Sequence, residues 1–326
     1  MKSREAVFGL IMLIISLLLV VGVAELGVRI LFHEKKEYTL EMWKYARQLK
    51  RVAADPVVGH EHVPSRSARL MGVDVSINSN KLRDREIPFE KPAGTKRILM
   101  LGDSLAFGWG VDFESTSSKV LERLLNDGKT PPAYEVINTG VGNYNTAMEV
   151  QYFFNEGHKY APDLVILNYF INDAEETPRY TGNFINEHLQ SWVYLAGRVD
   201  TARRMAGRSK TWNEHYSELY SDGAPGWQQT RAAVKRLGAW CKEHNVPCLL
   251  ANQPELHNLK NYPFTAVNEK LAALSEEAGL EYLDLLPSVR EEAEETLWVT
   301  VPDPHPNNKA CTLFGQGLAA HLKGKI

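Results

Sequence analysis

A continuous apolar run near the N-terminus is the strongest hydrophobic pattern in the chain. Residues 6–24 carry no charge, and a helix of that length, at about 1.5 Å per residue, crosses a bilayer core of about 30 Å. We therefore predict a single transmembrane helix within an N-terminal anchor, residues 1–33. A cleaved signal peptide is the alternative, because Gly22 and Ala24 have the small-residue spacing of a cleavage site.

From about residue 95 onward, short apolar runs alternate with amphipathic segments. We predict strands over 97–101, 134–138, 163–169, 246–251 and 280–285 and helices over 119–125, 146–157, 227–243, 265–278 and 310–322. Strands that alternate with helices indicate an α/β domain with a parallel sheet wrapped by helices. We assign this domain to residues 95–326.

Residues 34–94 are expected to form a stalk and an N-terminal extension. The part over 34–50 is polar with scattered aromatic residues, which is typical of a surface helix close to a membrane, and nothing in it indicates chemistry. Short strands and turns are expected after it. The motif His60-Glu61-His62 has metal-ligand character, but no third ligand lies nearby in the sequence, so we expect a solvated loop.

A long interruption of the α/β alternation lies at about 174–226. It is rich in Tyr, Trp and Asn, and an interruption of this length is more often functional than idle. We interpret it as a lid or substrate-binding insertion beside the domain, with a packing flap as the alternative.

Composition limits the class of protein. A chain of 326 residues with 44% hydrophobic and 24% charged positions can bury one catalytic α/β core plus appendages, and its net charge of −3 argues against a nucleic-acid partner. The cysteines Cys241, Cys248 and Cys311 are interpreted as small buried hydrophobes, with a Cys241–Cys248 bridge as an open alternative. The sequence has neither a phosphate-binding glycine fingerprint nor zinc-ligand spacing, so we expect no cofactor and no metal.

Two motifs carry candidate chemistry. The first predicted strand breaks into the turn Gly102-Asp103-Ser104-Leu105, which places Ser104 at the carboxyl end of a strand, where ligands bind in α/β sheets. Near the C-terminus stands Asp303-Pro304-His305. In an extended segment residues two apart point to the same side, so Asp303 can orient His305 while the far nitrogen of His305 faces Ser104. Asp103 is expected to stabilise its turn by hydrogen bonding, and Asp173 likewise.

The order of four motifs resembles the SGNH, or GDSL, hydrolase family. They are Gly102-Asp103-Ser104-Leu105, the stretch 138–146 after a predicted strand, Phe170-Ile171-Asn172-Asp173 and Asp303-Pro304-His305-Pro306. The resemblance covers about residue 55 to the end. It implies a three-layer α/β/α, flavodoxin-like fold with a central parallel sheet, and a catalytic triad of Ser104, His305 and Asp303.

The resemblance also implies an oxyanion hole. Its donors would be the backbone N–H of Ser104, a backbone N–H from the second motif and the side-chain amide of Asn172, which donates without bringing a charge. A turn role is the alternative for Asn172. The family glycine of the second motif falls on Asn143, five residues after Asn138, and an alignment on Gly142 remains open. Because asparagine tolerates a left-handed backbone, Asn143 can still present its N–H. Phe170 stands where the family usually has glycine.

The implied activity is that of a serine esterase acting on an acyl ester, most directly an O-acetyl group on an envelope or extracellular glycan. An O-acyltransferase that hands the same acyl group to a polysaccharide is the first alternative. A lipase or lysophospholipase-like esterase and a non-catalytic envelope assembly module are the others. Positive charges flank the predicted helix on both sides, so they do not decide its orientation. Anchored or secreted relatives of this type work outside the cytoplasmic membrane, and we expect a periplasmic or extracellular domain.

Overall fold

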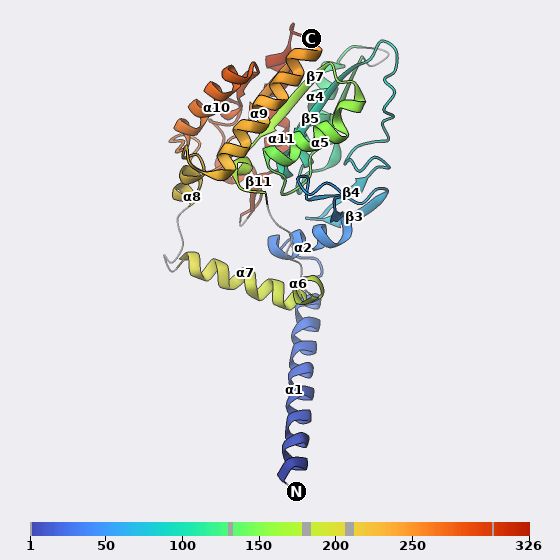
Figure 1. Cartoon of the computed structure of the whole chain (residues 1–326), viewed down its shortest axis with the longest axis vertical. Helices are drawn as coiled ribbons and strands as arrows, with labels where there is room; N and C mark the ends of the chain where they lie inside the picture. Colours follow the sequence, from blue (N-terminus) through green and yellow to red (C-terminus); the bar gives the residue numbers. More distant parts are fainter. Residues whose placement is uncertain (1, 130–132, 178–183, 206–211, 302) are drawn as a thin grey trace.

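A five-stranded parallel sheet forms the centre of the molecule in the computed structural model, which describes residues 2–129, 133–177, 184–205, 212–301 and 303–326 (Figure 1). The strand order is β6-β5-β7-β8-β9. The strands are β5 (Lys96–Gly102), β6 (Tyr134–Asn138), β7 (Leu164–Tyr169), β8 (Cys248–Asn252) and β9 (Glu281–Asp284). β5 has a neighbour on either side, β6 and β7, so the residues that follow it lie near the middle of the sheet edge.

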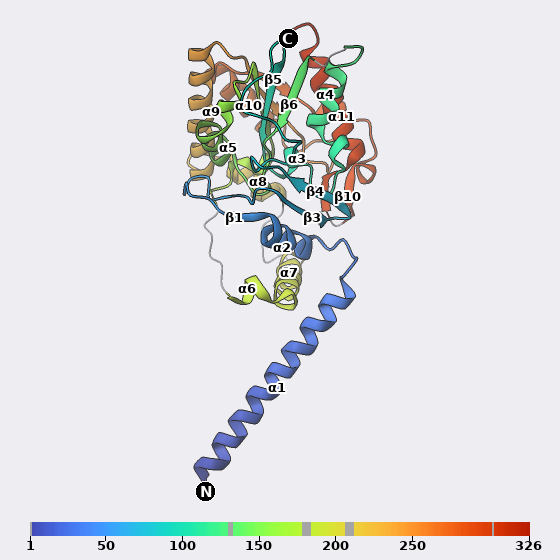
Figure 2. The same cartoon turned by 90° about the vertical axis from the view of Figure 1, so that its right-hand side faces the viewer.

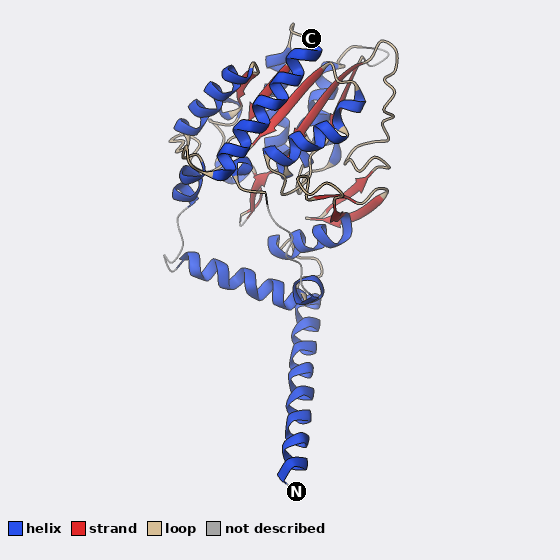
Figure 3. Ribbon diagram, viewed as in Figure 1, coloured by secondary structure: helices blue, strands red, loops and turns tan. Residues whose placement is uncertain are grey.

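Helices cover both faces of this sheet (Figures 1 and 3). They are α4 (Ser117–Leu125), α5 (Thr146–Asn155), α9 (Pro225–His244), α10 (Thr265–Ala278) and α11 (Asn308–Leu322). Alternate residues of β5 enter different cores: Leu99 and Leu101 pack with α5, α9 and α10, whereas Ile98 and Met100 pack with α4 and α11. The three-layer α/β/α fold is therefore confirmed, and burial on both faces explains why these strands read as continuous apolar runs.

The N-terminal helix α1 (Lys2–Leu31) is longer than the predicted span. Its stretch Arg4–Leu31 is long and apolar enough to cross a membrane, and its large apolar side chains are exposed rather than buried in the protein. α1 leaves the rest of the molecule as a single straight helix (Figure 2). A signal sequence meets the same description, so the structure leaves both readings of this segment open.

The segment after α1 contains the expected helix, but this helix packs into the domain rather than standing apart as a stalk or lying on the surface. Helix α2 (Tyr38–Leu49) buries Tyr45 and Leu49 completely. They pack with Phe107 and Trp109, which follow the first predicted strand of the α/β domain. The sequence did not indicate the buried face of α2 for two reasons. The residues it packs against lie about sixty positions further on, and a short amphipathic helix shows only one weak apolar stripe.

Small antiparallel strands complete the periphery. They are β1 (Lys50–Val52) with β2 (His60–His62), β3 (Arg66–Leu70) with β4 (Val73–Ile77), and β10 (Trp298–Thr300) with β11 (Asp303–Pro306). The expectation of a solvated loop at His60-Glu61-His62 is wrong, because these residues form β2 and His62 is 0% exposed. Within the described ranges, no group of three His, Cys, Asp or Glu side chains is placed to hold a metal ion.

The described part of the insertion is helical and consists of α6 (Phe184–His188), α7 (Gln190–Met205) and α8 (Trp212–Leu219). α7 lies against α1 and α2, whereas α8 lies against the turn that carries Asn172 (Figures 1 and 2). The described part of the insertion therefore divides into two parts. Its residues 178–183 and 206–211 lie outside the described residues.

All three cysteines are buried free thiols. They serve as the small hydrophobes expected from the sequence, and no bridge joins Cys241 to Cys248.

Candidate active site

Ser104 lies where β5 ends and the short helix α3 (Ser104–Phe107) begins. Asp103 caps this helix, since its Oδ1 accepts a hydrogen bond from the Leu105 nitrogen at 2.8 Å. Ser104 keeps only 7% of its surface exposed. The turn thus presents the hydroxyl of a nearly buried serine at the carboxyl end of a central strand. Asp103 stabilises the turn as the sequence suggested.

Two buried contacts hold this turn in place. Arg83 donates hydrogen bonds to the carbonyl oxygens of Phe107, Gly108 and Val111 at 2.9, 2.5 and 2.7 Å. Gly140 approaches the backbone of α3 so closely that an added Cβ would lie 2.2 Å from the Phe107 nitrogen. Only glycine fits at that position, so the loop after β6 can pack directly against the serine turn.

His305 and Asp303 lie on β11 and meet Ser104. His305 Nε2 is 3.0 Å from Ser104 Oγ, and His305 Nδ1 is 2.5 Å from Asp303 Oδ1. The second carboxylate oxygen, Asp303 Oδ2, accepts a hydrogen bond from Trp109 Nε1 at 3.0 Å. The structure thus places serine, imidazole and carboxylate in one hydrogen-bonded row, with the carboxylate fully buried and held on both oxygens.

The loop after β6 supplies the second candidate motif. Asn143 has a left-handed backbone (φ +67°), a conformation that asparagine tolerates better than most residues. The N–H of Gly142 is already used, because it donates to the Tyr45 hydroxyl at 3.0 Å. Its carbonyl oxygen accepts from Lys50 Nζ at 2.5 Å and lies 3.0 Å from His60 Nε2. This arrangement favours Asn143 over Gly142 as the residue with a free N–H for the substrate.

Asn172 belongs to the 3₁₀ turn η3 (Ile171–Ala174) that follows β7. Its side-chain oxygen is buried and has no hydrogen-bond partner among the residues that the structure describes. Asp173 fulfils the capping role instead, since its Oδ2 accepts from the Phe170 nitrogen at 3.1 Å. The Asn172 side chain is therefore not needed for the turn, which favours its role as a donor in the site.

Sequence reasoning missed the aromatic residue that covers the histidine. The Tyr38 ring stacks on His305 with centroids 5.8 Å apart and planes at 29°. Tyr38 comes from α2, the segment in which no chemistry was expected. No motif could have indicated it, because its partner lies 267 positions later in the chain.

Burial sets the charge state around the candidate oxyanion loop. It lowers the pKa of Lys50 to about 7, and with the charge of Lys50 it lowers the pKa of His60 to about 4. Burial likewise lowers the pKa of His62 to about 3. Both imidazoles are therefore neutral at pH 7. The partners then assign their protons: His60 donates from Nε2 to Gly142, and His62 accepts from the Tyr45 hydroxyl.

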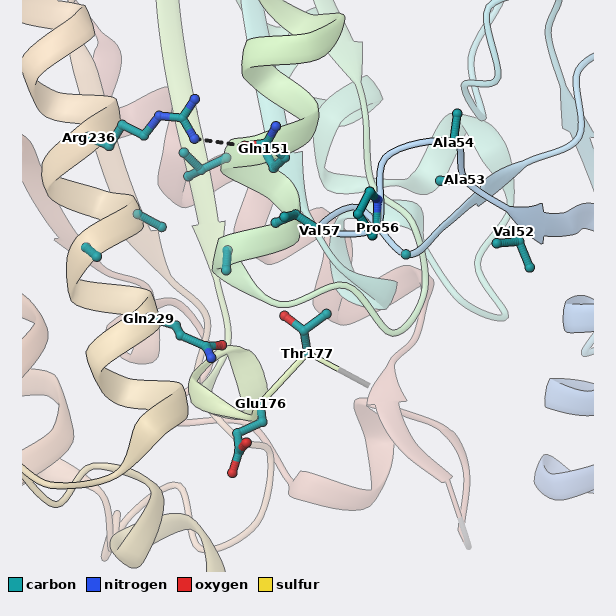
Figure 4. A pocket seen from close by; sticks show the side chains of 15 residues that line it. Val52, Ala53, Ala54, Pro56, Val57, Gln151, Glu176, Thr177, Gln229 and Arg236 are labelled. Atoms are coloured by element: carbon teal, nitrogen blue, oxygen red, sulfur yellow. Dashed lines mark hydrogen bonds between the residues drawn. The ribbon is translucent and has the colours of Figure 1, made fainter. Parts of the chain in front are cut away.

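A separate groove of about 770 Å³ lies beside α5 and α9 (Figure 4). Its walls include Val57 and Val150, and Arg236 donates a hydrogen bond to Gln151 at 2.8 Å across it. None of the residues Ser104, His305 and Asn172 lines it. The groove is therefore distinct from the candidate site, and the reacting atoms lie outside it.

Three solved structures illustrate the likeness of the fold. TesA matches with a TM-score of 0.47 and 14% identity over 71% of this chain and 100% of its own. An α/β hydrolase from the metagenome of Lake Arreo, Spain, has a TM-score of 0.46 and 14% identity over 71% of this chain and 95% of its own. A two-domain esterase active on acetylated mannans has a TM-score of 0.45 and 16% identity over 71% of this chain and 50% of its own.

No curated protein sequence is significantly similar to this chain. The family model that describes the GDSL-like lipase/acylhydrolase family matches residues 100–312, which is more than half of the 326 residues. The chain therefore belongs to the GDSL-like lipase/acylhydrolase, or SGNH hydrolase, family and is a serine hydrolase that acts on ester bonds.

Proposed function

We propose that this protein is a single-pass membrane esterase that removes a short acyl group, in the first place an acetyl group, from a glycan outside the cytoplasmic membrane. The observation that carries the proposal is the row of hydrogen bonds from Ser104 Oγ through His305 to Asp303. In this proposal Ser104 is the nucleophile, His305 the general base and Asp303 the group that orients it.

The reaction proceeds in two steps, acylation of Ser104 and hydrolysis of the acyl-enzyme. His305 Nε2 takes the proton of Ser104 as the Oγ atom bonds to the ester carbonyl carbon, and the carbonyl oxygen becomes an oxyanion. The bond to the alcohol then breaks, and His305 returns the proton to the leaving oxygen. Water repeats these steps on the acyl-enzyme and releases the acid, which restores Ser104.

The oxyanion needs hydrogen-bond donors that are fixed before the reaction. We assign this role to the N–H groups of Ser104 and Asn143 and to the amide of Asn172. The contacts of Tyr45, Lys50 and His60 with Gly142 support this assignment, because they fix the peptide next to Asn143.

The near-complete burial of Ser104 favours a short acyl group. Ser104 is only 7% exposed, and Tyr38 stacks on the partner histidine. A long acyl chain would need an apolar channel leading to Ser104, whereas the groove of Figure 4 lies elsewhere. This distinguishes the proposal from a lipase or lysophospholipase-like function.

The membrane part of the proposal is carried by α1. Within the 28-residue stretch Arg4–Leu31, the most apolar 18-residue window has a mean hydropathy of 3.0, and none of that window is buried in the protein. Helix α2 follows at Tyr38, a few residues after α1 ends at Leu31, and packs against the α/β domain. We accordingly propose an anchor over 1–33, an extension over 34–94 and a catalytic domain over 95–326.

A pair of acetyl esters and a sugar acceptor test the proposed activity. The full-length protein in detergent is incubated with a chromogenic acetyl ester and with its octanoyl counterpart, and Ser104→Ala is the control. We expect release from the acetyl ester that depends on Ser104 and exceeds release from the octanoyl ester. Faster octanoyl release would indicate a lipase, and product that appears on an added glycan rather than as free acetate would indicate an acyltransferase. Full activity of a folded Ser104→Ala protein would contradict the triad.

A further inference from the structure

Helix α7 carries an exposed apolar stripe. Trp192, Leu195 and Val199 are 48%, 55% and 41% exposed. Their spacing of three and four residues places them on one side of the helix. The preceding helix α6 adds Phe184 and Ile185, which are 72% and 47% exposed. Large apolar side chains gathered in this way on a protein surface mark an interaction site.

The other side of α7 packs against the N-terminal segment. An added Cβ on Gly197 would lie 3.0 Å from the Thr39 side chain on α2, and the Tyr194 ring lies 4.7 Å from the Phe32 ring. α7 thus lies beneath α2, and α2 separates it from the α/β domain (Figures 1 and 2). The apolar stripe consequently points away from that domain.

Contacts with α1 fix the direction of α7. Glu25 of α1 accepts hydrogen bonds from the backbone nitrogens of Gln190 and Ser191 at 3.1 and 2.9 Å, and Arg29 pairs with the same carboxylate at 2.7 Å. The carboxylate satisfies N–H groups at the start of α7, where negative charge is favoured. α7 runs across the end of α1 rather than along it (Figure 1).

We propose that α6 and α7 lie on the lipid surface, with Trp192, Leu195 and Val199 in the boundary between headgroups and acyl chains. The proposal rests on α1 crossing the membrane, as argued above. α7 lies across the end of α1 (Figure 1), and its apolar stripe faces the same side as α1. This is the placement of an interfacial helix. Tryptophan is the residue that most favours this depth. α7 is in contact with α1, and the large apolar side chains of both helices are exposed, which argues for lipid rather than a protein partner.

The orientation has a consequence for the substrate. α2 lies between α7 and the catalytic end of the domain, and its Tyr38 touches His305. With α7 on the lipid, the serine is held at the membrane-facing end of the domain. We infer that the substrate class is an ester carried by a molecule that is itself attached to the membrane.

Site-specific fluorescence tests the placement without using activity. The full-length Leu195→Cys protein is labelled with an environment-sensitive dye and placed in lipid nanodiscs, with Glu291→Cys on the exposed surface as the matched control. The three natural thiols are buried, so the unsubstituted protein gives the labelling blank. We expect a blue-shifted dye at 195 that is quenched by lipid-borne nitroxide, and an unshifted, unquenched dye at 291.

The alternatives give different signals. A dye at 195 with the spectrum of the control at 291 would overturn the proposal. A dye that is shielded from water but not quenched by lipid would indicate contact between two copies of the chain and would also overturn it. Loss of the whole protein from the nanodiscs would show instead that α1 is not an anchor.

Activity provides the second readout. The Leu195→Glu/Val199→Glu protein carries two charges into the proposed lipid boundary, which should reduce turnover of a lipid-tethered acetyl ester by about tenfold. Turnover of the soluble chromogenic ester should stay unchanged, because neither residue touches the site. An equal loss on both esters would reveal damage to the domain and contradict the inference about the substrate.

Discussion

The Tyr45 hydroxyl accepts a hydrogen bond from the Gly142 nitrogen at 3.0 Å and so joins residues 97 positions apart. Its own proton goes to His62 Nε2 at 2.7 Å, and His62 Nδ1 donates to the Lys81 carbonyl at 3.0 Å. The row is fully satisfied and consistent with a neutral His62. The segment between α1 and the central sheet therefore fixes the loop that we assign to the oxyanion hole.

Replacing Tyr45 with Phe should slow the reaction more than it weakens binding. The change leaves the buried Gly142 N–H without an acceptor, which costs about 1–3 kcal/mol, and the loop relaxes away from its reactive geometry. We expect kcat to fall by about tenfold while KM changes little. Steady-state kinetics on the chromogenic ester provide the measurement.

Tyr160→Phe is the matched control, because Tyr160 is equally buried but lies beside Arg97 at the start of β5. It should leave kcat unchanged. Equal losses of kcat in the two proteins would mean that Tyr45 acts only through stability.

The sequence predicted the α/β framework well because its signals are local. The strand Tyr134–Asn138 and the helix Thr265–Ala278 have the bounds expected from their hydrophobic periodicity alone. The sequence also singled out Ser104 and His305, which the structure brings within 3.0 Å of each other, since each stands in a short motif. A short motif identifies these positions without any information on the rest of the chain.

The surroundings of the site could not be predicted, because they depend on contacts between distant segments. Trp109 meets Asp303 across 194 positions, and Tyr38 meets His305 across 267. Neither aromatic residue lies in a motif, and a Tyr in an amphipathic helix reads as core packing. A single sequence contains no signal that distinguishes these partners from others.

Trp109→Phe should impair catalysis through Asp303. The indole donates to Asp303 Oδ2 at 3.0 Å, and a hydrogen bond to a charged group contributes about 1.5–3 kcal/mol. Without it the carboxylate can rotate away from His305, so we expect kcat to fall by about ten- to a hundredfold. Trp240→Phe is the control that should keep its rate, because Trp240 lies in α9 and its ring packs on Phe153 and His244 rather than on a residue of the site. An unchanged kcat in Trp109→Phe would show that the His305 contact alone holds the carboxylate.

Glu149→Gln should stabilise the protein above acidic pH. Glu149 is buried, neither carboxyl oxygen has a hydrogen-bond partner among the described residues, and burial together with Asp103 raises its pKa well above the ordinary value of 4.5. A raised folded-state pKa contributes stability below the unfolded value, and that stability is lost as pH rises through the folded value. Each unit of difference corresponds to about 1.4 kcal/mol.

Thermal midpoints at about pH 5 and about pH 8 provide the measurement. The midpoint of Glu149→Gln relative to the natural protein should rise between these values, since the amide does not titrate. Glu243→Gln on the surface should show no such trend. A constant difference for Glu149→Gln would show that Glu149 does not change its charge over this range.

Removal of the anchor should convert an integral protein into a peripheral one. The full-length protein should stay with the membrane after salt and alkaline washing, because a helix that spans the bilayer, as we propose for α1, buries its apolar surface in lipid. A protein that lacks residues 1–33 keeps α7 and should be released by the alkaline wash. Sedimentation and immunodetection report the outcome. A soluble mature protein that begins near Glu25 would instead support a signal peptide.

Asn172→Ala separates an oxyanion donor from a turn residue. A donor aimed at charge that develops in the transition state should lower kcat by about 10²–10³ and change KM little. A turn residue would instead cost about 1 kcal/mol of stability and leave the rate per folded molecule near normal. The structure favours the donor, because the Asn172 side-chain oxygen caps nothing in the described chain while Asp173 bonds the turn.

Asn126→Ala supplies the comparison, since the Asn126 side chain bonds the Tyr134 backbone far from the site and should lower only the thermal midpoint. Thermal melting and steady-state kinetics are therefore measured on both proteins. If Asn172→Ala behaves like Asn126→Ala, the oxyanion is held by the backbone N–H groups of Ser104 and Asn143 without the amide.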